Sequence, residues 1–139
     1  MIQRMQSIWL FLAAVAAFLS FKFSFFSGNF IGPDKVKVFK SLTASGNLVL
    51  LTLTVAVGVV ALVAIFLYKN RKLQMRFTLA TLLMSLLTII LYYNQTQLFV
   101  EGKYDLTAVV TLLVPIFLVL AARGIYKDQK LIRSLDRLR

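Results

Sequence analysis

Four long apolar runs, almost free of charged side chains, constrain this chain more than any other feature. They cover about residues 7–26, 48–68, 77–93 and 106–122. A helix needs about 20 predominantly apolar residues, within a range of roughly 17–25, to cross the hydrocarbon core of a bilayer. The runs therefore predict an all-α membrane protein, with residues 1–139 forming a single domain, a four-transmembrane-helix bundle. The last two runs are short, so we expect their helices to continue into the polar flanks.

Composition also favours the membrane class. Hydrophobic residues make up 60% of the 139 positions and charged residues only 15%, against roughly 45–50% and 25% in ordinary soluble domains. The charged residues are bunched between the apolar runs, whereas the amphipathic elements of a soluble core would carry them every few residues. The sequence has no cysteine and no histidine, which excludes disulfides, thiol chemistry and zinc bound by these side chains.

The first apolar run has a second interpretation, a cleaved signal peptide, because Arg4 precedes it. Cleavage requires small residues just after the apolar core. The run instead ends in FKFSFF, residues 21–26, which is bulky and aromatic. We therefore favour an uncleaved membrane helix.

The distribution of basic residues predicts the orientation in the membrane. Three segments on one side hold eleven of the 16 lysines and arginines: the one before the first run, the link between the second and third runs, and the tail after the fourth. The opposite side holds Lys22, Lys35, Lys37, Lys40 and Lys103. Because positive residues concentrate in cytoplasmic segments, we expect both termini in the cytoplasm.

The C-terminal tail, residues 123–139, has the pattern of an amphipathic helix. Ile125, Ile132 and Leu135 fall near one face, with basic side chains beside them. Such a helix can lie in the membrane interface and attract anionic lipid at about 1 kcal/mol per basic residue. A docking surface for another protein or for the ribosome is the second interpretation, whereas no aromatic platform indicates nucleic acid. The candidate surface for anionic lipid or a partner comprises Lys69, Arg71, Lys72, Arg76, Arg123, Lys127, Lys130, Arg133, Arg137 and Arg139.

A polar stripe in the third run is the clearest packing signal. Its members recur at spacings of three and four residues: Thr78, Thr81, Ser85, Thr88, Tyr92 and Gln95. This spacing places them on one helix face, which we expect to turn toward the other helices. In the second run, Thr54 and Gly58 form a pair of small residues that allows close helix contact, and Pro115 predicts a kink in the fourth run. Helix packing is the favoured role of these residues, and a polar path for a small solute is the alternative.

Two segments between the runs carry short strand patterns. KVKVFK, residues 35–40, alternates basic and apolar residues, which is the period of a strand. LFV, residues 98–100, is followed by a turn at Glu101 and Gly102. The segments either pair as a short two-stranded β cap on the outer side or remain loops, since a lone ribbon is marginally stable.

The acidic residues do not form a catalytic constellation. The complete set is Asp34, Glu101, Asp105, Asp128 and Asp136. General acid–base catalysis needs titratable groups within reach of one substrate, whereas these acids lie in loops or among the basic residues of the tail. No histidine is available to activate a serine, and no glycine-rich phosphate loop occurs. We therefore expect no catalytic, cofactor-binding or metal-binding residue, and no enzyme.

The two ends of the chain resemble a known family. MIQRMQSIWLFLAA at residues 1–14 and LAARGIYKDQKLIRSLDRLR at residues 120–139 are similar to short four-span membrane proteins of Bacteroidota, described as a domain of unknown function. The most specific elements are Met1 to Arg4 and Arg123 to Arg139, while the middle of the chain matches by hydropathy. The resemblance implies a bacterial inner membrane and four spans. It brings no activity, cofactor or catalytic residue.

The leading hypothesis for function is a small inner-membrane protein that acts through protein contacts, as an accessory, assembly or scaffold subunit of a larger complex. The expected partners are a bilayer with anionic headgroups and another membrane protein or a second copy of this chain. The alternative is a component of a small-solute transporter or channel, with the polar stripe lining its path. Transporters usually bury a charged residue at mid-membrane, and the apolar runs place none there.

Overall fold

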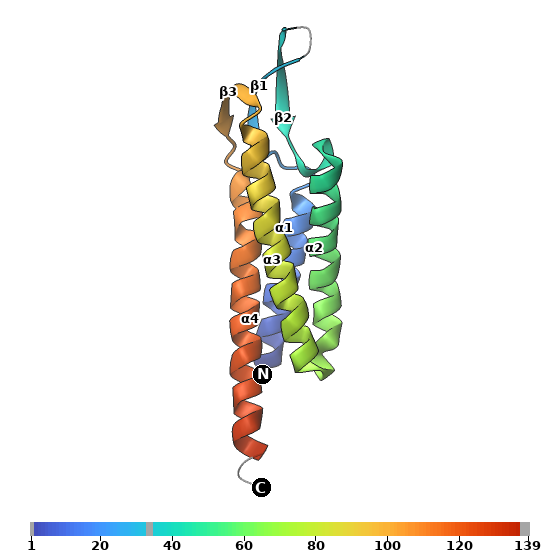
Figure 1. Cartoon of the computed structure of the whole chain (residues 1–139). Coiled ribbons are helices and arrows are strands. Elements are labelled where there is room, and N and C mark those ends of the chain that lie inside the picture. Colours follow the sequence, from blue (N-terminus) through green and yellow to red (C-terminus); the bar gives the residue numbers. More distant parts are fainter. Residues whose placement is uncertain (1, 33–34, 137–139) are drawn as a thin grey trace.

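The computed structural model describes residues 2–32 and 35–136, with side chains for residues 5–32 and 35–134. These residues form four α-helices, three strands and two short 3-10 turns (Figure 1). In chain order they are α1 (Ile2–Leu19), β1 (Phe26–Ile31), β2 (Lys37–Leu42), η1 (Ala44–Gly46), α2 (Leu48–Phe66), η2 (Leu67–Lys69), α3 (Arg71–Thr96), β3 (Phe99–Tyr104) and α4 (Ala108–Asp136).

The helices lie side by side, and each packs against two others. α1 and α3 both contact α2 and α4. The four helices therefore form an elongated bundle, with the strands at one end (Figure 1). The shared core includes small side chains such as Ala13, Ala17 and Ala121. At Gly58 a methyl group would lie only 2.7 Å from the ring of Phe18. Small residues of this kind let helix backbones approach closely, which strengthens packing between helices in lipid.

Among the described residues, three helical segments are long and apolar enough to cross a membrane: Leu48–Lys69, Arg71–Thr96 and Ala108–Ser134. The last two continue into their polar flanks, as the sequence predicts. The apolar part of α1, Met5–Leu19, is shorter. The structure therefore has three long candidate spans and one shorter apolar helix packed beside them.

The first predicted span, residues 7–26, is wrong at its C-terminal end. α1 stops at Leu19, and Phe26 is instead the first residue of β1. The centroid of the Phe26 ring lies 5.3 Å from that of Phe99 and 5.2 Å from that of Tyr104, in edge-on contacts. Both partners are on β3. An apolar aromatic segment suits a buried strand as well as a helix, and this aromatic cluster favours the strand.

The tail is helical, but it is not a separate surface helix. α4 runs from Ala108 through Pro115 to Asp136 as one element. Ile125 is fully buried and Asp128 is 8% exposed, so this part of the tail packs on the bundle. The predicted C-terminal helix therefore forms as a continuation of α4. Its first part is buried against the bundle, whereas Leu131 and Ile132 further along it are exposed.

The cap is a three-stranded antiparallel sheet in the order β2–β1–β3. The predicted strands at residues 35–40 and 98–100 both form in part, but β1 lies between them. The prediction of a two-stranded sheet is wrong because it omits β1. Most of β1 is the SGNFI segment, residues 27–31, which lacks the alternation of polar and apolar residues that marks a strand in sequence. Gly28 lies opposite Gly102, and a side chain at Gly28 would overlap the carbonyl oxygen of Glu101.

Asp105 connects the sheet to the bundle. The hydroxyl groups of Ser24 and Ser27 donate hydrogen bonds to its carboxylate. The adjacent Phe25 stacks on Tyr92 of α3, with the ring centroids 4.6 Å apart. The start of β1 is thus bonded to the segment before α4 and packed on α3, which holds the sheet on one end of the bundle.

Candidate functional site

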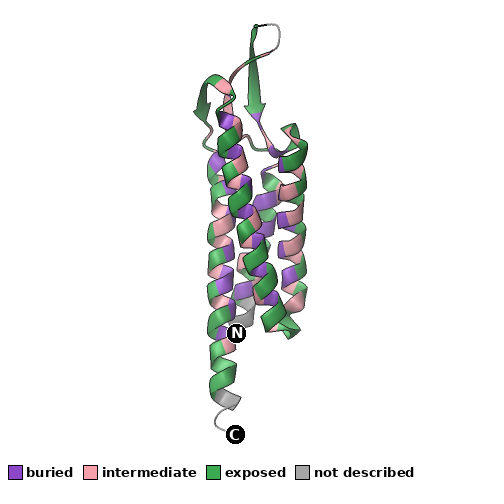
Figure 2. Ribbon diagram, viewed as in Figure 1, coloured by how far each residue is buried: buried purple, intermediate pink, exposed green. Residues whose placement is uncertain are grey.

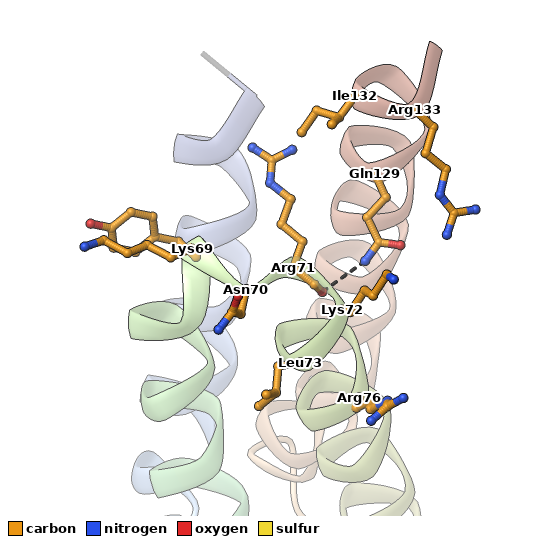
Figure 3. A pocket seen from close by; sticks show the side chains of 10 residues that line it. Lys69, Asn70, Arg71, Lys72, Leu73, Arg76, Gln129, Ile132 and Arg133 are labelled. Atoms are coloured by element: carbon orange, nitrogen blue, oxygen red, sulfur yellow. Dashed lines mark hydrogen bonds between the residues drawn. The ribbon is translucent and has the colours of Figure 1, made fainter. Parts of the chain in front are cut away.

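A basic groove lies at the end of the bundle opposite the sheet. It has a volume of about 910 Å³ and lies between the α2–α3 turn and the C-terminal part of α4 (Figure 3). Five of its lining residues are cationic, and the others are polar or apolar. The lining residues are Tyr68, Lys69, Asn70, Arg71, Lys72, Leu73, Arg76, Gln129, Ile132 and Arg133.

Arg71 fixes the shape of this groove. Its Nη1 lies 2.8 Å from Oδ2 of Asp128 on α4 and donates to the Asp128 carbonyl at 3.4 Å. In return, Nε2 of Gln129 donates to the Arg71 carbonyl at 3.0 Å, the dashed line in Figure 3. The two side chains of the ion pair are only 20% and 12% exposed. Arg71 is therefore neutralised, and it clamps the start of α3 to α4.

Three other cations define one side of the groove. Figure 3 shows Lys72, Arg76 and Arg133 projecting to the same side, with Lys69 on the opposite side. Within the described residues, the acidic partners in ion pairs are Asp128, bound to Arg71, and Glu101, bound to Lys37 at the other end of the molecule. The three cations therefore concentrate positive charge on the α3–α4 side of the groove.

The start of α3 adds to this positive field. Its N-cap residue, Asn70, makes no side-chain capping hydrogen bond. The backbone N–H groups of a first helical turn have no partner within the helix, and the helix dipole places partial positive charge there. An anion in the groove would meet these groups as well as the side chains.

The structure brings together only part of the basic surface that the sequence predicts. Lys69, Arg71, Lys72, Arg76 and Arg133 line the groove. The remaining described members are exposed along α4, outside the groove: Arg123, Lys127 and Lys130. Arg137 and Arg139 lie outside the described residues.

The polar stripe of α3 lies inside the bundle. Its buried members are Thr78, Thr81, Ser85, Thr88 and Tyr92, and Gln95 is half-buried. In Figure 2 buried positions, in purple, recur along α3 between exposed ones in green. Gln74 and Thr96 extend the same buried face, and the sequence analysis missed both. Each lies four residues from a stripe member, so the spacing alone would have identified them had it been followed beyond the apolar run.

Four of the stripe hydroxyls bond to their own helix, whereas the buried Tyr92 hydroxyl makes no such bond. Each of the four donates to a backbone carbonyl three or four residues earlier, at 2.7–2.9 Å: Thr78 to Gln74, Thr81 to Phe77, Ser85 to Leu82 and Thr88 to Met84. On α2, Thr54 does the same to Leu50 at 2.6 Å. These hydroxyls are therefore satisfied within each helix and do not link one helix to another.

A small cavity in the interior of the bundle lies beside Ser85 and Thr88 of the polar stripe. It is bounded by all four helical segments and has a volume of about 20 Å³, enough for about one water molecule. Its hydroxyl-bearing residues are Ser20, Thr54, Ser85, Thr88 and Thr111. The bundle is therefore almost completely filled at this level.

Pro115 does not face the polar stripe. It lies instead in a separate apolar groove of about 310 Å³ on the outside of the α3–α4 contact. The other lining residues are Leu82, Leu86, Ile116, Val119 and Leu120. Pro115 and the stripe hydroxyls of Ser85 and Thr88 therefore border different hollows.

Metal ligands are sparse in the part of the chain that the structure describes. This part contains no group of three or more acidic, histidine or cysteine side chains close enough to hold an ion.

In comparisons with other proteins, no curated protein and no solved structure matches this sequence. A family model described as "Domain of unknown function (DUF4293)" matches residues 2–138. Because the match covers nearly the whole chain, the protein belongs to this family of unknown function.

Proposed function

We propose that this protein is a four-span protein of the bacterial inner membrane, with both termini in the cytoplasm, that serves as an accessory, assembly or scaffold subunit of a larger membrane complex. The observation that carries the proposal is the C-terminal part of α4. It extends beyond the other helices as a basic arm (Figure 1). We name residues 126–136 of α4 the arm.

One face of the arm is suited to a protein partner. Lys127, Leu131 and Ser134 are spaced by four and three residues, which places them on one helix face. All three are exposed, Leu131 at 48%. An exposed apolar side chain beside a cation matches a partner with a small apolar pocket and an acidic side chain next to it, since complementary charge guides docking and apolar burial stabilises the complex.

The length and position of α1 support four spans rather than three. Its apolar part, Met5–Leu19, rises by about 22 Å at 1.5 Å per residue, which covers most of the hydrocarbon thickness of about 30 Å. It also contacts both α2 and α4 in the bundle. With four spans, the basic link between α2 and α3 lies on the same side as both termini, in agreement with the excess of lysine and arginine in cytoplasmic segments.

The interior favours a structural role over transport through a single copy. The cavity among the stripe hydroxyls holds about one water molecule. The Ser85 and Thr88 hydroxyls beside this cavity donate to backbone carbonyls of their own helix, so their hydrogens are not free to replace the hydration shell of a passing solute.

The test is a purification of the tagged full-length protein from its native membrane in mild detergent, followed by mass spectrometry and blue-native electrophoresis. We expect a stoichiometric membrane-protein partner that the Lys127→Gln/Leu131→Gln variant loses. The control is Lys103→Gln/Val100→Gln, which likewise replaces one lysine and one apolar side chain by glutamine, at exposed positions of β3. A partner that both variants keep, or a homogeneous self-assembly with no partner, would refute the proposal. Truncation at residue 123 is unsuitable, because it removes the buried Ile125.

A further inference from the structure

We propose that one anionic phospholipid binds along the outside of the α3–α4 contact. Its phosphate lies among Lys72, Arg76 and Arg133, and one acyl chain lies in the apolar groove beside Pro115. We call this surface the α3–α4 lipid site. It adds a ligand to the chain and does not depend on the protein partner proposed above.

The apolar end of the site is a groove that opens away from the bundle. Its volume is about 310 Å³, and every lining residue is apolar. Leu86, Ile116 and Val119, which line it, are each more than 40% exposed. The groove lies between two helices long and apolar enough to cross a membrane, so an acyl chain is the ligand that the surroundings would supply.

The apolar groove and the cationic side of the basic groove share one strip of surface. On α3, Lys72, Leu79 and Leu86 are seven residues apart, and on α4 Val119, Tyr126 and Arg133 have the same spacing. Residues seven apart lie nearly above one another on a helix. The α3 series and the α4 series therefore both change from apolar to basic side chains toward the same end of the bundle.

The length of this strip fits a phospholipid. Ten residues separate Arg76 from Leu86, which is about 15 Å along a helix. The hydrocarbon layer of one leaflet is also about 15 Å thick, half of the roughly 30 Å core. A phosphate held at Arg76 thus places its acyl chain beside Leu86. Tyr126, 61% exposed, lies between the two ends, at the depth where tyrosine is enriched in membrane proteins.

The charge at the basic end favours an anionic headgroup over a neutral one. Arg71 is already paired with Asp128 at 2.8 Å, whereas Lys72, Arg76 and Arg133 form no ion pair with any acidic side chain that the structure describes. The uncapped start of α3 adds N–H donors of the kind that bind phosphate at helix N-termini. Basic pockets between membrane helices are typical binding sites for anionic lipid headgroups.

The headgroup end of the lipid site and the proposed docking face use different residues of α4, so each can fail independently. The docking face is formed by Lys127, Leu131 and Ser134. Arg133 is offset from it around the helix and lines the basic groove together with residues of α3. A variant of Arg133 therefore tests lipid binding without removing the apolar side chain that would contact a partner.

The experiment is native mass spectrometry of the purified full-length protein in detergent, with cardiolipin, phosphatidylglycerol or phosphatidylcholine added in turn. We expect one cardiolipin or phosphatidylglycerol molecule to remain bound at concentrations about tenfold below those at which phosphatidylcholine binds. The Lys72→Gln/Arg133→Gln variant should weaken anionic lipid binding about tenfold. Its control, Lys40→Gln/Lys103→Gln, removes the same net charge at exposed positions of the sheet and should leave binding unchanged.

A second pair of variants tests the acyl-chain groove. Val119→Phe fills the groove and should reduce lipid retention several-fold, whereas Val59→Phe, at an equally exposed position of α2, should not. Equal effects of the two charge variants would overturn the site, because binding would then follow net charge alone. Equal effects of the two phenylalanine variants, or displacement of the lipid by inorganic phosphate, would overturn the lipid assignment, because the groove would then recognise phosphate without an acyl chain.

Discussion

The guanidinium of Arg71 lies 2.8 Å from the carboxylate of Asp128, and this ion pair joins residues 57 positions apart. It connects the first residue of α3 to the part of α4 that the sequence predicts as an amphipathic C-terminal helix. The pair is mostly shielded from solvent, at 20% and 12% exposure. Arg71 also lines the basic groove, so the contact joins one wall of the groove to the α4 arm.

Replacing Asp128 by asparagine should destabilise the protein by about 1–3 kcal/mol, because a shielded guanidinium loses its partner. The measurement is thermal unfolding in detergent, followed by circular dichroism. Lys37→Gln is the control, since it breaks the exposed ion pair with Glu101, and exposed pairs contribute little. Equal shifts of the melting temperature in the two variants would contradict the clamp.

Replacing Gly28 by alanine should destabilise the sheet. A Cβ at this position overlaps the carbonyl oxygen of Glu101 on the neighbouring strand, and backbone shifts to relieve such overlap cost about 1–3 kcal/mol. Gly32→Ala is the matched control, because its Cβ would meet no atom within 4 Å. Limited proteolysis of the sheet should be faster in Gly28→Ala alone. Similar cleavage rates in both variants would argue against the close strand approach.

The pKa of Glu101 should lie below its ordinary value of 4.5, because Lys37 donates a hydrogen bond to it, as does Asn29, and the charge of Lys37 adds to the effect. A depressed pKa means that this contact stabilises the sheet above about pH 4.5 and is lost as the pH falls through the lower, folded-state value. Carboxyl carbon NMR shifts during an acid titration measure it. Lys37→Gln should return the midpoint toward 4.5, and an unchanged midpoint would contradict the contact.

Replacing Thr88 by valine should change stability by less than about 1 kcal/mol, because its hydroxyl bonds only to the Met84 carbonyl of its own helix. By contrast, Gly58→Leu should destabilise strongly, since even a methyl there would lie 2.7 Å from the Phe18 ring. Melting temperature and assembly size in detergent report both effects. A large loss in Thr88→Val would mean that the hydroxyl acts between helices.

The helices, and the buried face of α3, could be predicted from sequence because each depends on local spacing. The run from Thr78 to Gln95 repeats every three or four residues, and this period identifies a face without knowledge of its neighbours. β1 could not be predicted in the same way. Its sequence, FSGNFI, has no regular alternation, and it becomes a strand because β2 and β3 pair with it from both sides.

The grooves could not be predicted because each combines segments far apart in the sequence. Lys72 and Arg133 were both assigned to one basic surface, but their common position beside the apolar groove depends on how α3 and α4 pack. The continuity of α4 was missed for a related reason. Ile125 reads as part of an amphipathic tail in isolation, and only the fold places it in the core.

The most direct test of the proposed function is photo-crosslinking in native membranes, with a crosslinking amino acid placed at Leu131 on the α4 arm. Leu83 is the reference position, because it is an exposed leucine on α3, 64% accessible, away from the arm. We predict a discrete adduct with another membrane protein from position 131 and none from position 83. Equal yields from both positions, or no protein adduct from position 131, would contradict the assignment of the arm as a docking surface.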